Sequence, residues 1–358
     1  MVMPVFHAGD ILPNIHKFGV LRANVLGDFI FALPAFEALR GTYPAAEIVL
    51  LGRAWHAAFM GNRAGPIDRV MVMPEGAIGD QAGITPDPAA VRAFLADARD
   101  EHFDLAVQIH GGGRNSNPFL LQAGGRWTIG LRTEDAAALD CSIPYLYFQP
   151  ETLRYLEVVA LVGARTEAIE PRLRVTDADL CESSKVVPYD ARRLAVLHPG
   201  ASAPARRWPP ERFARVGDAL AARGLRVIVT GVSDEAALAN EVVDTMTAPA
   251  EDVCGRLSVC GLTGLLARAA VLVSNDTGPL HVGMAVGAPT VGIYWCGNMI
   301  NAGPFSRRFN RPAVSWQVVC RACGVNTLAQ KCPHGHPPVD DVSVEEVLGH
   351  TLDLLHCV

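Results

Sequence analysis

The sequence carries no excess of positive charge. Its 31 Lys and Arg residues are outnumbered by 37 Asp and Glu residues, which gives a formal net charge of -6 at pH 7. A surface that binds nucleic acid concentrates positive charge. We therefore exclude nucleic acid as a partner, and any phosphate group that the protein binds must be held by a few local groups.

The sequence also lacks the segments that direct a chain into or across a membrane. Residues 1–10 contain no basic stretch followed by an apolar core and a small-residue cleavage site. No apolar run approaches the roughly 20 residues that span a bilayer. The nine cysteines are an odd number and most are scattered, which is typical of reduced thiols in cytosolic proteins. We expect a cytoplasmic protein without a transmembrane segment.

What the sequence does contain is a long and apolar chain. It has 358 residues, of which 50% are hydrophobic and 19% charged, and this length exceeds what one hydrophobic core usually organises. The apolar pattern weakens over 175–193, around Pro188, which suits an interdomain linker. We expect two domains, 1–180 and 181–358, with the last helical stretch packing on the second domain or back on the first.

Short apolar runs alternate with segments of helical spacing through both halves. The runs that predict strands are 19–21, 47–51, 69–72, 105–109, 194–197, 225–230, 271–274 and 290–293. Helices are expected at 29–40, at 211–223 and at 343–355, and a further helix is expected to end near residue 99. This alternation predicts the α/β fold class, with two Rossmann-like, doubly wound parallel sheets.

The loops that follow the strands are informative, because ligands of open parallel sheets gather at the carboxyl ends of strands. After 271–274, Thr277 is placed to cap a helix, and Gly278 lets an anion approach the backbone. With His281 one turn later, this segment predicts an anion site at a helix N-terminus. The alternative is an ordinary capped helix with a buried histidine.

Two further loops of the second half offer groups to a nucleotide diphosphate. After 194–197 come Ser202 and then the paired Arg206 and Arg207, whose guanidinium groups suit a diphosphate. After 225–230 come Asp234 and Glu235, where a carboxylate can accept hydrogen bonds from a ribose. Alternatively, the arginines are simply solvated, and the carboxylates complement a helix dipole.

The first half has candidate loops of its own. Asp28 lies beside a glycine at a helix start, where a carboxylate is either a cap or, opposite a bound donor, a general base. His110 begins a glycine-rich loop with Arg114 that is either an acceptor site or a tight strand-to-helix turn. We add Arg22 and Asn24 to this candidate acceptor site. The arginines that would meet a phosphorylated acceptor, if they converge, are Arg22, Arg53, Arg114 and Arg126.

Taken together, these loops resemble glycosyltransferase family 9, the heptosyltransferase family of lipopolysaccharide core assembly. The matching segments are LGD at 26–28, LPA at 33–35, YP at 43–44, HPGAS at 198–202, RWP at 207–209, CG at 254–255 followed by Leu262 and Leu265, NDTGPLH at 275–281 and APT at 288–290. They stand in family order, each after a predicted strand, and the resemblance covers residues 20–347.

The resemblance implies a GT-B architecture, in which an acceptor-binding and a donor-binding Rossmann-like domain face a central cleft. It implies inverting, metal-independent and cofactor-free transfer of a sugar, expected to be heptose, from a nucleotide-diphosphate donor to a lipopolysaccharide-core or related glycan or glycolipid acceptor. Asp28 falls on the proposed catalytic base of the family. The donor-binding positions are Ser202, Arg206, Glu235, Asp276, Thr277, Gly278 and His281. A lipid-carried acceptor would bring the protein to the inner face of the cytoplasmic membrane.

Two positions depart from the family pattern. Many members have lysine where this chain has Arg206, which keeps a positive charge with a different geometry, and serine where it has Thr277, which keeps the hydroxyl and adds a methyl group. Both changes bear on which donor sugar fits the site. Two other functions stay open: a non-catalytic relative that binds nucleotide sugars, and a sugar-nucleotide epimerase of the same architecture.

A cysteine cluster stands apart from these loops. Cys320, Cys323 and Cys332, with His334 and His336 nearby, have a spacing that suits a structural zinc site. The family resemblance carries no zinc requirement. We therefore expect no metal and keep structural zinc as the alternative.

Overall fold

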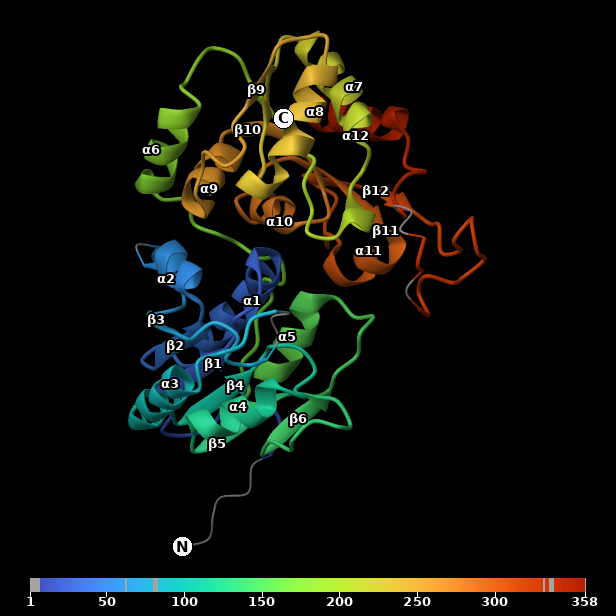
Figure 1. Ribbon diagram of the computed structural model, residues 1–358. Helices are drawn as coiled ribbons and strands as arrows, with labels where there is room; N and C mark the ends of the chain where they lie inside the picture. The colour runs from blue at the N-terminus through green and yellow to red at the C-terminus, as the bar shows by residue number, and fades with distance from the viewer. Residues whose placement is uncertain (1–6, 62, 80–82, 331, 335–337, 358) are drawn as a thin grey trace, which may run out of the picture. The chain divides into compact units, whose positions relative to one another are not determined.

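The computed structural model describes residues 7–61, 63–79, 83–330, 332–334 and 338–357 (Figure 1). The chain divides into two compact units, Met1–Arg174 and Val175–Val358. Each unit is built on its own parallel sheet with helices packed against it. None of the helices in these ranges has the length and the apolar run that crossing a membrane requires.

The first unit holds a six-stranded sheet in which every neighbouring pair is parallel. Its strands are β1 (Lys17–Leu21), β2 (Glu47–Gly52), β3 (Arg69–Val72), β4 (Leu105–Gln108), β5 (Trp127–Arg132) and β6 (Cys141–Pro144). Its helices are α1 (Leu26–Thr42), α2 (Ala54–Met60), α3 (Pro88–Asp100), α4 (Ser116–Ala123) and α5 (Glu151–Ala160). The strand order is β3-β2-β1-β4-β5-β6.

Burial explains why the strands of this sheet read as continuous apolar runs. In β2 the run 48–51 is fully buried, because helices cover both faces of a parallel sheet. Phe94 of α3 and Leu120 of α4 belong to one core cluster with Leu21 and Val49. The helices α1 and α5 pack against each other. Most of α1 is buried, which is why its sequence is apolar on nearly every side.

The second unit repeats this plan. Its strands are β7 (Leu194–His198), β8 (Arg226–Val229), β9 (Ala250–Asp252), β10 (Ala269–Asn275), β11 (Thr290–Trp295) and β12 (Asn310–Ser315). Its helices are α6 (Asp177–Val186), α7 (Pro210–Ala221), α8 (Ala236–Thr245), α9 (Val259–Ala267), α10 (Gly278–Ala285), α11 (Cys296–Ala302) and α12 (Val344–Cys357), with short 3-10 turns at Pro204–Arg206 and Ser233–Glu235. The strand order is β12-β11-β10-β7-β8-β9.

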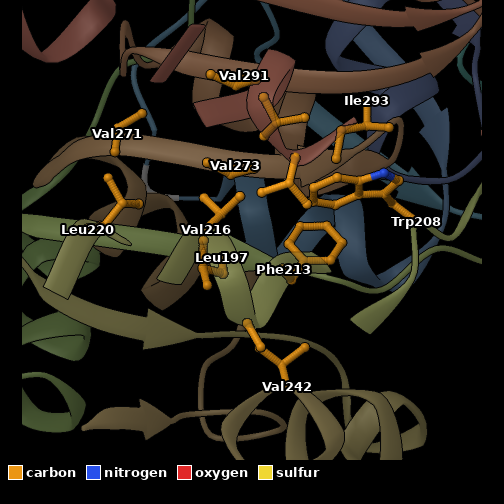
Figure 2. Packing of buried hydrophobic residues seen from close by; sticks show 14 of the residues in the cluster. Leu197, Trp208, Phe213, Val216, Leu220, Val242, Val271, Val273, Val291 and Ile293 are labelled. Atoms are coloured by element: carbon orange, nitrogen blue, oxygen red, sulfur yellow. The ribbon is translucent and has the colours of Figure 1, made fainter. Parts of the chain in front are cut away.

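The core of the second unit lies between the sheet and the helices α7, α8 and α12. Figure 2 shows Trp208 and Phe213 against the side chains of Val273 and Ile293. The two rings meet edge to face, with centroids 5.1 Å apart. Full burial of each such side chain stabilises the fold by about 1.5–3 kcal/mol. This core holds the loop that contains Trp208 firmly against the sheet.

Both sheets have the strand order of a Rossmann fold, in which the first and fourth strands of the unit lie side by side. The predicted α/β class, with two Rossmann-like doubly wound domains as in the GT-B fold, is confirmed. The last helix, α12, packs on α7 and on β10, β11 and β12 of its own unit.

The predicted linker at 175–193 is wrong over most of its length. Residues 177–186 form α6, which packs closely on α9. The two helices approach so closely that a Cβ on Gly264 would lie 2.1 Å from the carbonyl oxygen of Asp179. The side chains that α6 buries, Asp179 and Ser183, are polar, so the helix leaves no apolar periodicity in the sequence.

Candidate functional site

In each unit, the loops after the first and fourth strands meet where the strand order reverses. Ligands of doubly wound sheets bind at this switch point. In the second unit, the loops after β7 and β10 meet there. Asn275 joins them: its Nδ2 donates to the carbonyl of Pro199 at 2.8 Å, and its Oδ1 accepts from the amide of Trp208 at 3.0 Å. Asn275 was not among the predicted donor-binding residues.

Asp276 follows Asn275 and lies almost fully buried beneath the start of α10. Its Oδ1 lies 3.2 Å from Nε2 of His281, and its Oδ2 accepts a hydrogen bond from Asn298 of α11 at 2.7 Å. Nη1 of Arg206 approaches the same Oδ2 to 3.5 Å and the backbone oxygen of Asp276 to 3.3 Å. The structure thus brings together three of the predicted site residues and adds Asn298.

Thr277 and Gly278 form the entry to α10. Thr277 occupies the N-cap position in an extended conformation, and its side chain makes no capping hydrogen bond. Both residues are partly exposed. The partial positive charge of a helix N-terminus favours an anion at this point, and the Thr277 hydroxyl is not engaged in capping. This geometry can hold a phosphate group.

The two arginines of the loop after β7 differ in their contacts: Arg207 fixes the turn, and Arg206 is partly exposed. Arg207 donates from Nε to the carbonyl of Ala201 at 2.9 Å, which fixes the turn. The Arg206 side chain, at the end of the 3-10 turn, is 38% exposed and lies beside Asp276. Ser202 is exposed on the same loop. The loop therefore presents one guanidinium group and one hydroxyl toward solvent near the start of α10.

Glu235 lies in the 3-10 turn that follows β8 and contacts the loop after β7. Its Oε2 accepts a hydrogen bond from the amide of Val232 at 3.1 Å. Gly200 lies directly beneath the carboxylate, since a Cβ on that glycine would be 2.2 Å from Oε1. Burial lowers the pKa of His198, and the nearby Glu235 carboxylate opposes that shift. Glu235 thus stands at the same switch point, although far from Asp276 in sequence.

In the first unit, Arg22 fixes the start of α1. Its guanidinium group is 1% exposed and donates to the backbone oxygen of Asp28 from Nε at 3.1 Å and from Nη2 at 2.7 Å. A third bond runs from Nη1 to the carbonyl of Ile109 at 2.7 Å. The Asp28 carboxylate is 36% exposed, and its Oδ1 lies 4.0 Å from Nη2 of Arg22. Arg22 therefore holds the backbone that presents Asp28.

Glu151 also lies beside Arg22, although it was not among the predicted site residues. Its Oε2 lies 4.0 Å from Nη2 of Arg22, and its Oε1 accepts a hydrogen bond from Arg154 at 2.5 Å. Tyr155 donates its hydroxyl proton to the same carboxylate and stacks beneath Arg22 at 4.4 Å. Burial raises the pKa of the Glu151 carboxyl group, against the lowering effect of the two arginines. The Asp28 carboxylate also raises it.

The four residues predicted to bind an acceptor lie in the loops that follow β1 and β4. Nδ1 of His110 accepts a hydrogen bond from the amide of Ala23 at 3.1 Å, so His110 and Asn24 share the switch point of the first unit. The Arg114 side chain is 80% exposed and pairs with Asp135 at 3.4 Å. The question whether Arg22, Arg53, Arg114 and Arg126 converge has a negative answer for Arg126, which directly precedes β5 and so lies at the opposite, amino-terminal edge of the sheet.

The predicted cysteine cluster does assemble. The ligand atoms of Cys320, Cys323, Cys332 and His334 all lie within 4.8 Å of one another. His336, the other nearby histidine, lies outside the described residues.

The chain is similar to known proteins over most of its length. The family profile described as "Glycosyltransferase family 9 (heptosyltransferase)" matches residues 92–331. The "Lipopolysaccharide heptosyltransferase 2" of Salmonella typhimurium is 24% identical over 313 residues, which is 83% of this chain and 85% of the relative. The "Lipooligosaccharide heptosyltransferase 2" of Haemophilus influenzae is 22% identical, over 82% of this chain and 85% of its own.

Two solved structures share the fold along nearly the whole chain. A glycosyl transferase family 9 protein from Veillonella parvula superposes with a TM-score of 0.82 at 18% identity, covering 97% of this chain and 99% of the other. The Escherichia coli structure described as "ADP-heptose lps heptosyltransferase II" gives a TM-score of 0.74 at 20% identity, covering 95% and 98%.

Proposed function

The chain belongs to glycosyltransferase family 9, and we propose on that premise that it transfers heptose from a nucleotide-diphosphate donor, such as ADP-heptose, to a lipopolysaccharide-core or related glycan acceptor. The relatives named above as lipopolysaccharide and lipooligosaccharide heptosyltransferases support this choice of sugar and acceptor. The proposal includes the cytoplasmic location expected from the sequence, with peripheral contact to the membrane that carries the acceptor. The acceptor-binding role belongs to the first unit and the donor-binding role to the second.

One observation carries the donor assignment. Arg206, the start of α10 and Glu235 come from three separate segments and meet at one switch point. The Arg206 guanidinium and the amides at Gly278 suit the two phosphates. The Glu235 carboxylate suits the hydroxyl groups of a ribose. Ser202 and Thr277 supply further hydroxyl groups at the rim.

Asp276 acts through its neighbours in this proposal. A buried carboxylate repels a diphosphate, so direct contact between the two is unfavourable. Its contacts with His281, Asn298 and Arg206 fix the direction in which these side chains point. We therefore assign Asp276 as a positioning residue and His281 as a donor-site residue.

In the transfer step, Asp28 takes the proton of the acceptor hydroxyl as the hydroxyl oxygen attacks the anomeric carbon. The bond from that carbon to the diphosphate breaks on the opposite side, so the anomeric configuration inverts. Negative charge grows on the leaving diphosphate, where Arg206 and the helix N-terminus stabilise it. These groups make a divalent ion unnecessary for the step. The partial exposure of Asp28 leaves room for the acceptor.

The test starts with donor choice. Thermal shifts with ADP-, GDP-, UDP- and dTDP-linked compounds should single out the adenine nucleotide. ADP-heptose and a heptose-deficient core acceptor, in buffer dialysed free of magnesium, should then yield ADP and an elongated acceptor whose new linkage has the inverted configuration. A modified sugar nucleotide formed without acceptor would instead favour an epimerase. Tight binding without any turnover would favour a non-catalytic relative.

A further inference from the structure

The chain between β12 and α12, residues 316–343, is a long connection. Its described residues form no helix or strand and make a single isolated bridge, between Val319 and Asn326. Connections beyond about 12–15 residues without secondary structure are uncommon in compact domains and need some other source of order. Cys320, Cys323, Cys332 and His334 all lie in this connection.

Two distances among these four side chains match those of a tetrahedral metal site, and all the ligand atoms lie within 4.8 Å of one another. With metal–sulfur bonds of about 2.3 Å and metal–nitrogen bonds of about 2.0–2.1 Å, a tetrahedron separates two sulfurs by roughly 3.8 Å and a sulfur from a nitrogen by roughly 3.6 Å. Sγ of Cys323 lies 3.6 Å from Sγ of Cys332, which in turn lies 3.6 Å from Nδ1 of His334. A disulfide would bring two sulfurs to about 2.05 Å.

The backbone around Cys320 is folded to present its sulfur. The amide of Gly324 donates to the carbonyl of Cys320 at 2.8 Å, and the amide of Cys320 donates to the carbonyl of Val325 at 2.9 Å. Gly324 has a φ of 71°, a left-handed conformation that favours glycine. This turn therefore brings the sulfur of Cys320 close to that of Cys323.

The second half of the cluster contains an amide-to-sulfur hydrogen bond, which orients a thiolate ligand and supports its negative charge. The amide of His334 donates to Sγ of Cys332 at 3.4 Å. Cys320 is buried, Cys332 is half-buried, and Cys323 and His334 are exposed. The cluster therefore lies at the surface, where an ion can enter, with one sulfur on its inner side.

We propose that Cys320, Cys323, Cys332 and His334 bind one thiophilic transition-metal ion, for which zinc has the best chemistry. Three thiolates and one imidazole are a common ligand set of structural zinc. Since the protein supplies all four ligands, no position is left for a substrate, and the ion orders the chain rather than acting in sugar transfer. This reverses the preference drawn from the sequence, where no metal was expected.

Two hydrogen bonds hold the connection 316–343 to segments near the proposed donor site. Nε1 of Trp295, at the end of β11, donates to the carbonyl of Gln317 at 2.9 Å. Nε1 of Trp208, which follows Arg206 and Arg207, donates to the carbonyl of Val342 at 2.9 Å. The proposed metal site lies between these two anchors along the chain. Loss of the ion should therefore loosen the connection and, through Trp208, weaken donor binding.

The first measurement is the metal content of the full-length protein, purified without a histidine tag. About one zinc or iron ion per chain is expected by inductively coupled plasma mass spectrometry. Cobalt added to chelator-treated protein should give the visible absorption of a tetrahedral site with thiolate ligands. Less than about a tenth of an equivalent of any transition metal, in protein that was never exposed to chelator, would overturn the proposal. A Cys323–Cys332 disulfide found by mass spectrometry would do the same.

Variants then assign the ligands. Cys323→Ser and His334→Ala should each reduce the bound metal at least about fivefold, whereas Cys181→Ser, at an exposed cysteine of α6, should keep it. Unchanged metal content in both ligand variants would refute the assignment. Metal content is read without substrate, so a failure here is distinguishable from a failure of the proposed sugar transfer. If a variant does not fold, the wild-type stoichiometry and the cobalt spectrum still decide the question.

Discussion

Asp276 and His281 face each other across the first turn of α10, with Oδ1 of the carboxylate 3.2 Å from Nε2 of the imidazole. Both side chains are nearly fully buried. The pair joins the end of β10 to the first turn of the helix whose N-terminus we assign to the donor phosphates. The orientation of the imidazole therefore depends on the carboxylate.

The first prediction concerns this pair. His281→Ala and Asp276→Asn should each weaken binding of the nucleotide diphosphate about 10–100-fold, because a hydrogen bond to a charged group contributes about 1.5–3 kcal/mol. Isothermal titration calorimetry measures the affinity. His356→Ala, at an exposed histidine of α12, is the matched control and should bind normally. Wild-type affinity in both site variants would remove the pair from the donor site.

The second prediction concerns Asp28. Asp28→Asn should lower the rate constant of transfer about 10²–10⁴-fold, the usual contribution of a general base. Donor affinity should stay within about twofold, since the carboxylate belongs to the first unit. Glu37→Gln, at an exposed carboxylate of the same helix, should leave both quantities unchanged. Near wild-type turnover by Asp28→Asn would mean that another group accepts the proton.

The third prediction follows from the contact between Gly200 and Glu235. In Gly200→Ala the new methyl group would meet Oε1 at 2.2 Å, so the carboxylate must swing away. Nucleotide affinity should fall about tenfold, which corresponds to the free energy of about one hydrogen bond. Glu235→Ala should cause the same loss. The double variant should show no further loss.

The control for this cycle is Gly349→Ala, where a Cβ would meet no atom within 4 Å. Because Gly349 lies inside α12, this change should stabilise the protein by about 0.5–1 kcal/mol and leave affinity unchanged. Additive losses in the Gly200 and Glu235 double variant would show that Gly200→Ala acts other than through the carboxylate.

The fourth prediction concerns the pH dependence of stability. His56 is fully buried against Trp55, at 3.7 Å between ring centroids. Burial, with the charges of Arg53 and Arg22, lowers the pKa of His56 to about 3. In the unfolded chain His56 has a pKa of about 6.5. Below that pH the unfolded chain binds a proton at His56, whereas the folded chain does not. The contribution of His56 to the free energy of unfolding is therefore fully present above about pH 6.5 and is lost as the pH falls toward 3.

The expected slope from this one group is about 1.4 kcal/mol per pH unit, or about 3 kcal/mol between pH 6.5 and 4. Urea unfolding at several pH values should show this slope reduced in His56→Gln. The matched change at the exposed His16, His16→Gln, should keep it. Equal slopes in the wild type and His56→Gln would show that His56 is protonated in the folded protein.

The candidate donor site could be predicted from the sequence, because the carboxyl ends of parallel strands meet at one edge of the sheet. That rule groups Arg206, Glu235 and His281, which come from separate segments, into one candidate site. It could not find Asn298 or Glu151. Asn298 lies on α11, after β11, and Glu151 lies on α5, after β6. Only the folded chain brings Asn298 to Asp276 and Glu151 to Arg22.

Four strands, β5, β6, β9 and β12, were not predicted, and two of them have a clear physical reason. β12 contains Pro312, which breaks a strand pattern but is tolerated because β12 lies at the sheet edge. β9 has the sequence AED, too short and too polar to read as a strand. In α6 the missing signal is apolar periodicity, since close packing on Gly264 replaces large apolar side chains.

The side chain of Asn275 links the two loops of the donor site before any ligand arrives. Its amide binds Pro199 on one side and Trp208 on the other. A ligand that enters such a site loses little free energy to the ordering of backbone. Association should then be fast and nearly independent of loop motion, and differences in affinity among donors should appear mainly in how quickly each one leaves.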